Sequence, residues 1–186
     1  MTAILVLDQA AIKLAQVIKC TIGNACIYGL VNRVEGADES FKETVSQLQS
    51  LYQSGESIIG LCATGILVRA LAPVLKDKKY EPAVLAVAAD GSAVVPILGG
   101  HNGANSLANQ IATAIGGIGA ITTASDIRLG VAIDDPPEGW NVNNRNAAKG
   151  IFSRMLAGKP IRLEISSGDV RWLKQSNIKF DDNAEG

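Results

Sequence analysis

The sequence is poor in aromatic residues, cysteine and histidine, and neither charge sign is in excess. Of its 186 residues, 4% are aromatic, three are cysteine and one is histidine. Seventeen basic residues stand against eighteen acidic ones, for a net charge of −1. This balance excludes a protein that binds nucleic acid mainly by neutralising phosphates, because such proteins need a basic excess or stripe.

The three cysteines do not form the pattern of a disulfide framework or a zinc site. Cys20, Cys26 and Cys62 are odd in number and lack the spacing of zinc ligands. We interpret them as reduced thiols, which favours a cytoplasmic location. Their expected role is that of small buried hydrophobic residues. A single histidine without a cysteine–histidine cluster also predicts that the protein itself holds no metal ion.

Long apolar runs are absent too. The run at residues 83–89 is far shorter than the ~18 residues of a membrane span, and Asp8 interrupts the first apolar run too early for a signal peptide. We therefore expect no membrane insertion. Apolar residues are nevertheless abundant, at 47% of the chain, which excludes disorder and predicts one compact domain with or without a short appendage.

Short apolar runs alternate with amphipathic stretches along the chain. We expect strands at residues 3–7, 25–31, 57–63, 83–89, 93–98, 120–124 and 160–165. We expect helices at residues 9–19, 38–53, 64–75, 104–115 and 144–156, with a kink or early end at Pro73. Asp90-Gly91 between two apolar runs predicts a β-hairpin. The sequence therefore predicts a Rossmann-like α/β fold, with a mostly parallel sheet that contains one antiparallel hairpin and is covered by helices.

Two turns have the same layout, in which a buried strand is followed by small residues and a helix start. Such turns present backbone N–H groups and the positive end of a helix dipole, which favour anions. A plain connector also explains each turn, and neither contains a nucleotide-binding glycine motif. The candidate binding residues in them are Thr64 and Gly65 in the first turn, and Gly99, Gly100, Asn102, Gly103 and Asn105 in the second.

Four further side chains are candidates, each with a structural alternative. His101, the only histidine, stands inside the second turn, where structural and catalytic roles are equally open. Arg69 is either a solvated helix charge or a carboxylate ligand. Thr122 and Thr123, which close an expected strand just before Asp126, either cap the next turn or face the ligand.

Several segments in the right order resemble the N-terminal domain of the CbiG family, the cobalt-precorrin-5A hydrolases of the anaerobic cobalamin pathway. They lie at residues 61–69, 72–78, 81–84, 90–91, 95–101, 104–105, 107–108 and 121–126. Around His101 the sequence is one glycine shorter than the family pattern. The resemblance implies an N-terminal-like domain at residues 1–130 and a middle-region-like segment at 131–186. It leaves the family's C-terminal domain unmatched, which implies that either a separate polypeptide supplies this domain or the protein works differently. Other cobalamin-pathway enzymes are further candidate partners, and a homo-oligomer stays open.

The resemblance also implies a substrate and a reaction. The substrate is a cobalt-corrinoid rich in carboxylates, and the cobalt arrives with it, so no cofactor is expected. Water opens a δ-lactone, acetaldehyde leaves and cobalt-precorrin-5B forms. We expect His101 to act as base or acid, backbone N–H groups of residues 100–104 to bind the oxyanion, and Asp126 to be the second catalytic candidate. Thr64, Gly65 and Arg69 would hold peripheral carboxylates. The alternatives are a non-catalytic corrinoid-binding or interaction subunit, and an anion-binding domain of unrelated function.

Overall fold

The structure is a computed structural model that describes residues 1–131, 133, 136–137 and 139–184. Within this part, the side chains of His101, Arg145 and Asn146 are not described. The run Asp134-Asp135-Pro136-Pro137 indicates a boundary by its sequence, and its first two residues lie outside the described part. The chain forms two compact units, Met1–Ile121 and Thr122–Gly186. The second unit thus begins nine residues before position 131, where the sequence analysis began the second segment.

The first unit is built on a seven-stranded sheet in the order β3-β2-β1-β4-β5-β6-β7. Its strands are β1 (Thr2–Val6), β2 (Ala25–Leu30), β3 (Glu39–Phe41), β4 (Ser57–Leu61), β5 (Val84–Val87), β6 (Ala93–Leu98) and β7 (Ile118–Gly119). The neighbouring strands run parallel except β5 and β6, which form the predicted antiparallel hairpin. The predicted α/β fold with a mostly parallel sheet is therefore confirmed.

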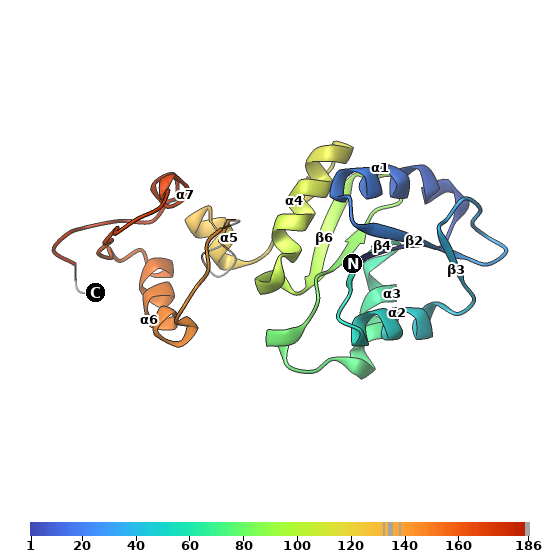
Figure 1. The fold of residues 1–186 in the computed structure, drawn as a ribbon, viewed down its shortest axis with the longest axis horizontal. Helices are drawn as coiled ribbons and strands as arrows, with labels where there is room; N and C mark the ends of the chain where they lie inside the picture. The colour runs from blue at the N-terminus through green and yellow to red at the C-terminus, as the bar shows by residue number, and fades with distance from the viewer. Residues whose placement is uncertain (132, 134–135, 138, 185–186) are drawn as a thin grey trace. The chain divides into compact units, whose positions relative to one another are not determined.

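Helices cover both faces of this sheet (Figure 1). Helices α1 (Ile12–Ile22) and α4 (Ala104–Ile115) contact one another on one face, and α2 (Thr44–Gln53) and α3 (Thr64–Leu71) do so on the other. Along β1 the side chains alternate between the two resulting cores, with Ile4 on the α1 side and Leu5 on the α2 side. Because both faces are buried, the strand is apolar without interruption.

Local sequence features explain where α2 begins and where α3 ends. The predicted helix at residues 38–53 is wrong at its start, because residues 39–41 form β3 and bury Phe41. The carboxylate of Glu43 then accepts a hydrogen bond from the Ser46 N–H and begins α2. Helix α3 ends at Leu71 and continues as a 3-10 turn that contains Pro73, as the proline predicts.

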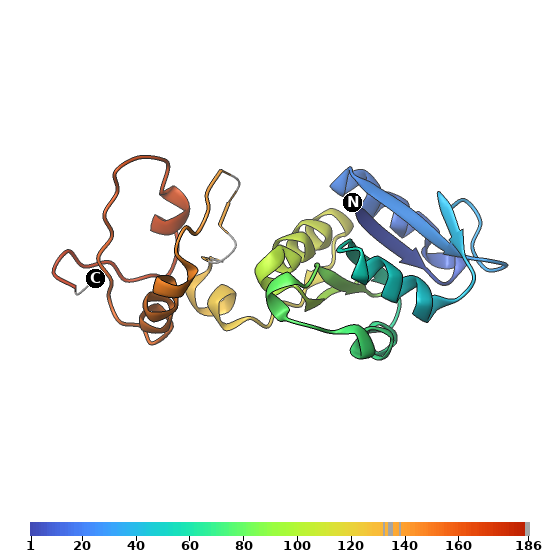
Figure 2. The ribbon, with the colours of Figure 1, turned by 60° about the horizontal axis from the view of Figure 1, so that its bottom comes forward.

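In its described residues, the second unit contains three short helices, α5 (Ala124–Leu129), α6 (Arg145–Leu156) and α7 (Arg171–Lys174), which are seen from two sides in Figures 1 and 2. Its core consists of Leu129, Met155, Ile161 and Ile178. The predicted strand at 160–165 is wrong, since only Ile161 forms a bridge, with Phe180. In the described part of the chain, no helix is both long and apolar enough to cross a bilayer.

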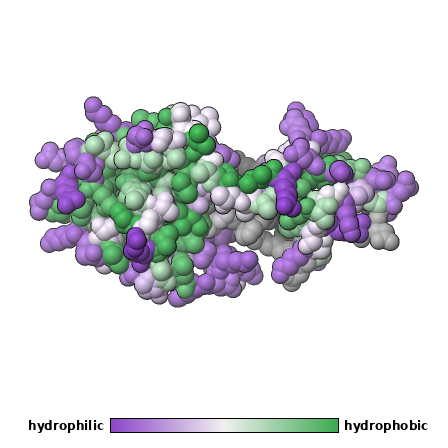
Figure 3. Space-filling view, turned by 180° about the vertical axis from the view of Figure 1, so that it is seen from behind, coloured by the Kyte–Doolittle hydropathy of each residue, from purple (hydrophilic) through white to green (hydrophobic). Residues whose placement is uncertain are grey.

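The surface of the first unit mixes charged side chains with apolar ones. Figure 3 shows hydrophobic surface interspersed with hydrophilic side chains over one face of the molecule. On α3, Ile66 and Val68 are exposed beside the buried Leu67. Exposed apolar side chains are ordinary in folded proteins, so these residues do not by themselves indicate a partner.

An ion pair fastens the last turns of α1 to the loop before β3. Lys19 Nζ donates to both carboxylate oxygens of Asp38, at 2.6 and 2.7 Å, and the Ile27 N–H donates to one of them at 2.7 Å. The lysine hydrogen bond, followed by the backbone one, holds the pKa of Asp38 below its usual value. The carboxylate therefore favours the folded state only while it is ionised.

We expect Asp38→Asn to lower the free energy of unfolding at pH 7 by no more than about 1 kcal/mol, since a pair exposed by more than a third is screened by solvent. A depressed folded-state pKa gives stability that is present above the unfolded pKa of about 3.9 and is lost below it. The difference between wild type and variant should shrink from about pH 5 toward pH 3. Urea unfolding at the two pH values measures it, and a difference that stays constant would contradict the assignment.

Candidate functional site

The two predicted turns lie at opposite edges of the sheet. Val84, at the start of β5, pairs with Ile58 near the start of β4 and with Leu98 at the end of β6. The loop that follows β6 therefore leaves at the edge where β4 begins. With five residues in β4 and about 3.3 Å per residue, the edges are about 16 Å apart. The two turns therefore cannot both contact the same small group of a ligand.

Thr64, Gly65 and Arg69 do come together, at the start of α3. Arg69 Nη1 donates to the Gly65 carbonyl oxygen at 3.0 Å. A Cβ at position 65 would lie 2.7 Å from that nitrogen, so glycine allows the guanidinium to lie along the first turn of its own helix. Thr64 is exposed beside it. A cation next to a helix N-terminus is suited to a carboxylate.

This turn also lies at the topological switch point of the sheet. β1 and β4 are neighbours, while the helices that follow them, α1 and α3, cover opposite faces. Ligands of open α/β sheets bind outside the carboxyl ends of the strands at such a point. Cys62 at the end of β4 is not a nucleophile at neutral pH, because burial raises the pKa of its thiol to about 11.

A cavity of about 600 Å³ opens at the same edge and was missed by the sequence analysis. Gln9, which follows β1, and residues 32–35, which follow β2, line it. The Gln9 amide accepts from the Glu35 N–H at 2.7 Å, which joins the two loops. Asn32 has a left-handed φ of 63°. Asparagine after an apolar run is a turn signal that was available in the sequence.

The second turn begins with a glycine that no other residue could replace easily. Gly99 has a φ of 73°, and a Cβ there would lie 2.5 Å from the carbonyl oxygen of Pro82. Its own carbonyl accepts from the N–H groups of Asn102 and Ala104, at 2.8 and 3.1 Å. Those two N–H groups therefore do not act as the predicted oxyanion donors. Of the predicted donors, the backbone N–H groups of residues 100, 101 and 103 stay as candidates.

Asn102 and Asn105 stabilise the structure of this turn and the helix after it. Asn102 Nδ2 donates to the Glu81 carbonyl at 2.7 Å, which holds the segment before β5 against the turn. Asn105 is 5% exposed and packs within the first turn of α4. Gly103, with a φ of 87°, is the N-cap of that helix. The backbone of His101 lies in the 3-10 turn Gly100–Asn102, while its side chain lies outside the described part.

Thr122, Thr123 and Asp126 belong to the second unit and do not close a strand. Thr123 is the N-cap of α5, and Asp126 lies in the first turn of that helix. The predicted strand at 120–124 is therefore wrong: β7 ends at Gly119, and a threonine followed three residues later by an acid begins a helix. An acidic side chain at this place stabilises the helix through its dipole.

The two remaining thiols, Cys20 and Cys26, differ in burial. Cys26 is partly buried, which raises the pKa of its thiol, whereas Cys20 on α1 is exposed, so its predicted burial is wrong. Within the described part of the chain, no three histidine, cysteine or acidic side chains are grouped so that they could hold a metal ion.

Comparison with known proteins gives consistent matches. Residues 46–126, which include both turns, match the family described as Cobalamin synthesis G N-terminal. A cobalt-precorrin-5A hydrolase from Priestia megaterium is 33% identical over 128 residues, which are 67% of this chain and 34% of that protein. A protein of the same name from Salmonella typhimurium is 34% identical over 136 residues, which are 71% of this chain and 38% of that protein.

The chain thus spans little more than a third of the length of the curated relatives it matches. The crystal structure of a cobalamin biosynthesis protein G homolog from Sulfolobus solfataricus shares the fold. It matches with a TM-score of 0.52 at 17% identity, over 96% of this chain and 52% of that one. By its matched region, this chain belongs to the CbiG family of cobalamin synthesis G proteins.

Proposed function

We propose that the chain takes part in cobalamin biosynthesis by hydrolysing the δ-lactone of cobalt-precorrin-5A, with release of acetaldehyde and formation of cobalt-precorrin-5B. The observation that carries the proposal is the match of residues 46–126, since it includes the 99–105 turn and its histidine. The two curated relatives are named for this hydrolysis. The cobalt enters with the substrate, so the proposal includes no resident cofactor.

The chemistry is assigned to the 99–105 turn. His101 removes a proton from water as the water oxygen adds to the lactone carbonyl carbon. The N–H groups of Gly100 and Gly103 stabilise the oxyanion. Collapse of this intermediate breaks the lactone C–O bond, and protonated His101 gives its proton to the departing oxygen, which leaves a carboxylic acid and a hydroxyl. His101 then removes the hydroxyl proton while the bond between the hydroxyl-bearing carbon and the macrocycle breaks. The conjugated system of the macrocycle keeps the electron pair of that bond, and the two-carbon fragment leaves as acetaldehyde.

The separation of the two turns changes what is expected of Arg69. It lies at the sheet edge opposite the 99–105 turn, so it cannot hold a carboxylate next to the reacting lactone. We therefore expect Arg69→Ala to leave both kcat and KM for cobalt-precorrin-5A within about twofold of wild type, as for an exposed charge whose hydrogen bond is to a carbonyl oxygen of its own helix. Steady-state acetaldehyde release measures both constants. A large rise in KM would instead place the substrate at the switch point, and would remove His101 from the reaction.

The proposal is tested by anaerobic incubation of the purified chain with cobalt-precorrin-5A, with acetaldehyde measured over time. Release above the rate without protein is the expected result. A spectral change of the corrinoid without release would favour the alternative of a corrinoid-binding subunit that acts with a partner polypeptide. If the chain neither releases acetaldehyde nor binds the corrinoid, both functions are contradicted.

A further inference from the structure

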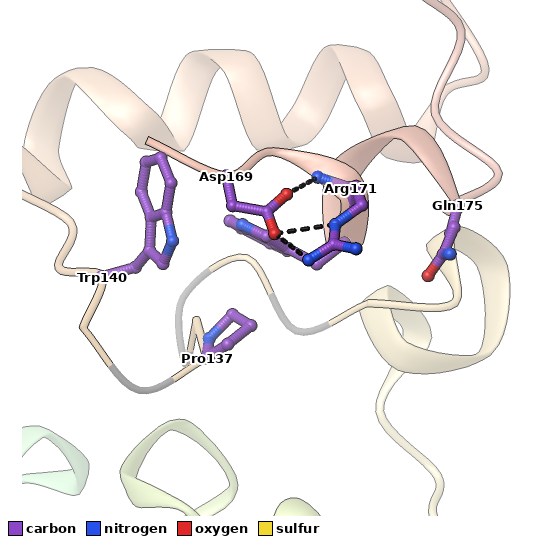
Figure 4. A pocket seen from close by; sticks show the side chains of 6 residues that line it. Pro137, Trp140, Asp169, Arg171 and Gln175 are labelled. Atoms are coloured by element: carbon purple, nitrogen blue, oxygen red, sulfur yellow. Dashed lines mark hydrogen bonds and ion pairs between the residues drawn. The ribbon is translucent and has the colours of Figure 1, made fainter. Parts of the chain in front are cut away.

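The second unit contains a pocket that the proposed chemistry does not use. It has a volume of about 390 Å³ and is lined by Pro137, Trp140, Asp169, Arg171, Trp172 and Gln175. Figure 4 shows Trp140 and Gln175 on either side of the Asp169–Arg171 pair. The volume lies in the range of small-molecule sites, and the lining combines aromatic rings with charged and amide groups.

The aromatic part of the wall is held in place by close packing. The rings of Trp140 and Trp172 meet edge to face, with centroids 6.0 Å apart. Gly168 has a φ of 91°, and a Cβ there would lie 2.9 Å from the Trp140 ring. Glycine thus lets the indole pack directly on the backbone that leads to Asp169. This wall offers apolar area to a ligand at little cost in conformational entropy.

The polar part of the wall presents hydrogen-bond donors. Arg171 Nε and Nη2 both donate to Asp169 Oδ2, at 2.7 and 2.5 Å, and the Arg171 N–H donates to Oδ1 at 2.9 Å. These contacts fix the guanidinium, yet its side chain stays 82% exposed. The indole N–H of Trp172 is shielded from solvent and has no acceptor in the described part of the chain.

We propose that this pocket binds a carboxylate-bearing arm of the corrinoid substrate, with the acid on the Arg171 guanidinium and the apolar frame against the tryptophan rings. An acceptor group on an apolar body is the ligand chemistry that matches both parts of the wall. The inference rests on the proposed function for the identity of the ligand. The carboxylate at Asp169 disfavours a second acid at any other place in the pocket, which restricts the ligand to one orientation.

The test compares two single-charge variants on the same helix, Arg171→Gln and Lys174→Gln. The probe is a cobalt corrinoid with free acetate and propionate groups, and its fully amidated counterpart is the comparison ligand. Calorimetry on the full chain should show about tenfold weaker binding of the acid form by Arg171→Gln, as for a lost charge-assisted hydrogen bond. Lys174→Gln, which removes the same charge outside the pocket, should stay within about twofold. The amidated form should bind Arg171→Gln and wild type alike.

The other outcomes separate the pocket from the proposed function. If wild type binds the acid form and Arg171→Gln binds it equally well, the pocket assignment is wrong while corrinoid binding stands. Equal weakening by both variants would reveal a general charge effect and would also overturn the assignment. If wild type does not bind the acid form, the pocket assignment and the corrinoid ligand fail together. Far-ultraviolet circular dichroism of each variant confirms that it is folded.

Discussion

His101→Ala is expected to lower kcat for acetaldehyde release by about a hundredfold or more, the usual contribution of a general base. The reason is that the lactone step needs a proton acceptor for water, and His101 is the only histidine of the chain. The dissociation constant of the corrinoid should change little, because the residue acts on the water rather than on the carboxylates. Single-turnover kinetics and calorimetry on the same samples measure the two quantities.

A second variant separates the role of His101 as a proton acceptor from a role of its side chain in packing. His101→Gln keeps a hydrogen-bonding side chain of moderate size but removes the proton acceptor, so it should be as slow as His101→Ala. Recovery of wild-type turnover in the glutamine variant would mean that position 101 only supports the loop. Near wild-type turnover in both variants would move the base elsewhere in the molecule.

Gly99→Ala should have the largest effect on folding, with a loss of about 3 kcal/mol in the free energy of unfolding. About 1 kcal/mol comes from placing alanine in the left-handed region, and the rest from overpacking. The added Cβ would lie 2.5 Å from the Pro82 carbonyl oxygen and 2.8 Å from the Ala83 Cα. Both are backbone atoms at the start of a central strand, so neither can move cheaply. Urea unfolding followed by circular dichroism measures the loss.

Gly116→Ala is the matched control for this prediction. Gly116 has a nearly identical φ of 71° and nothing within 4 Å of an added Cβ. It should lose only the backbone part, about 1 kcal/mol. Equal losses in the two variants would show that the contact with Pro82 does not matter, and that the strand yields to the new methyl group.

The elements that follow from local pattern were predictable. Continuous apolar runs identified β1, β2, β4, β5 and β6, although the runs at 120–124 and 160–165 are not strands. Asp90-Gly91 identified the hairpin, and the helix at 104–115 has the predicted bounds. The predicted hairpin makes β6 run antiparallel to β5, so the turn after β6 lies at the opposite edge of the sheet from the turn after β4. This separation could not be predicted from the hairpin alone, because it also depends on β4 lying beside β5, and no local pattern specifies the strand order.

The candidate site was less predictable, because side-chain roles depend on contacts between distant segments. Asn102 is a residue type typical of ligand-binding turns, yet its side-chain amide donates a hydrogen bond to the Glu81 carbonyl oxygen, 21 residues away in the sequence. Residues 39–41 have a helical pattern, but pairing with β2 makes them a strand. The tryptophan pocket joins residues that are separated by more than thirty positions, and nothing in the local sequence of either segment indicates that they meet.

The distribution of aromatic residues gives each unit its own optical signal. Both tryptophans of the chain, Trp140 and Trp172, lie in the second unit, and all three tyrosines, Tyr28, Tyr52 and Tyr80, lie in the first. Excitation at the red edge of the protein absorption band, where only indole absorbs, therefore follows the melting of Thr122–Gly186 alone, while tyrosine absorbance follows Met1–Ile121. The native chain thus reports, without any label, whether its two halves lose structure in one transition or in two.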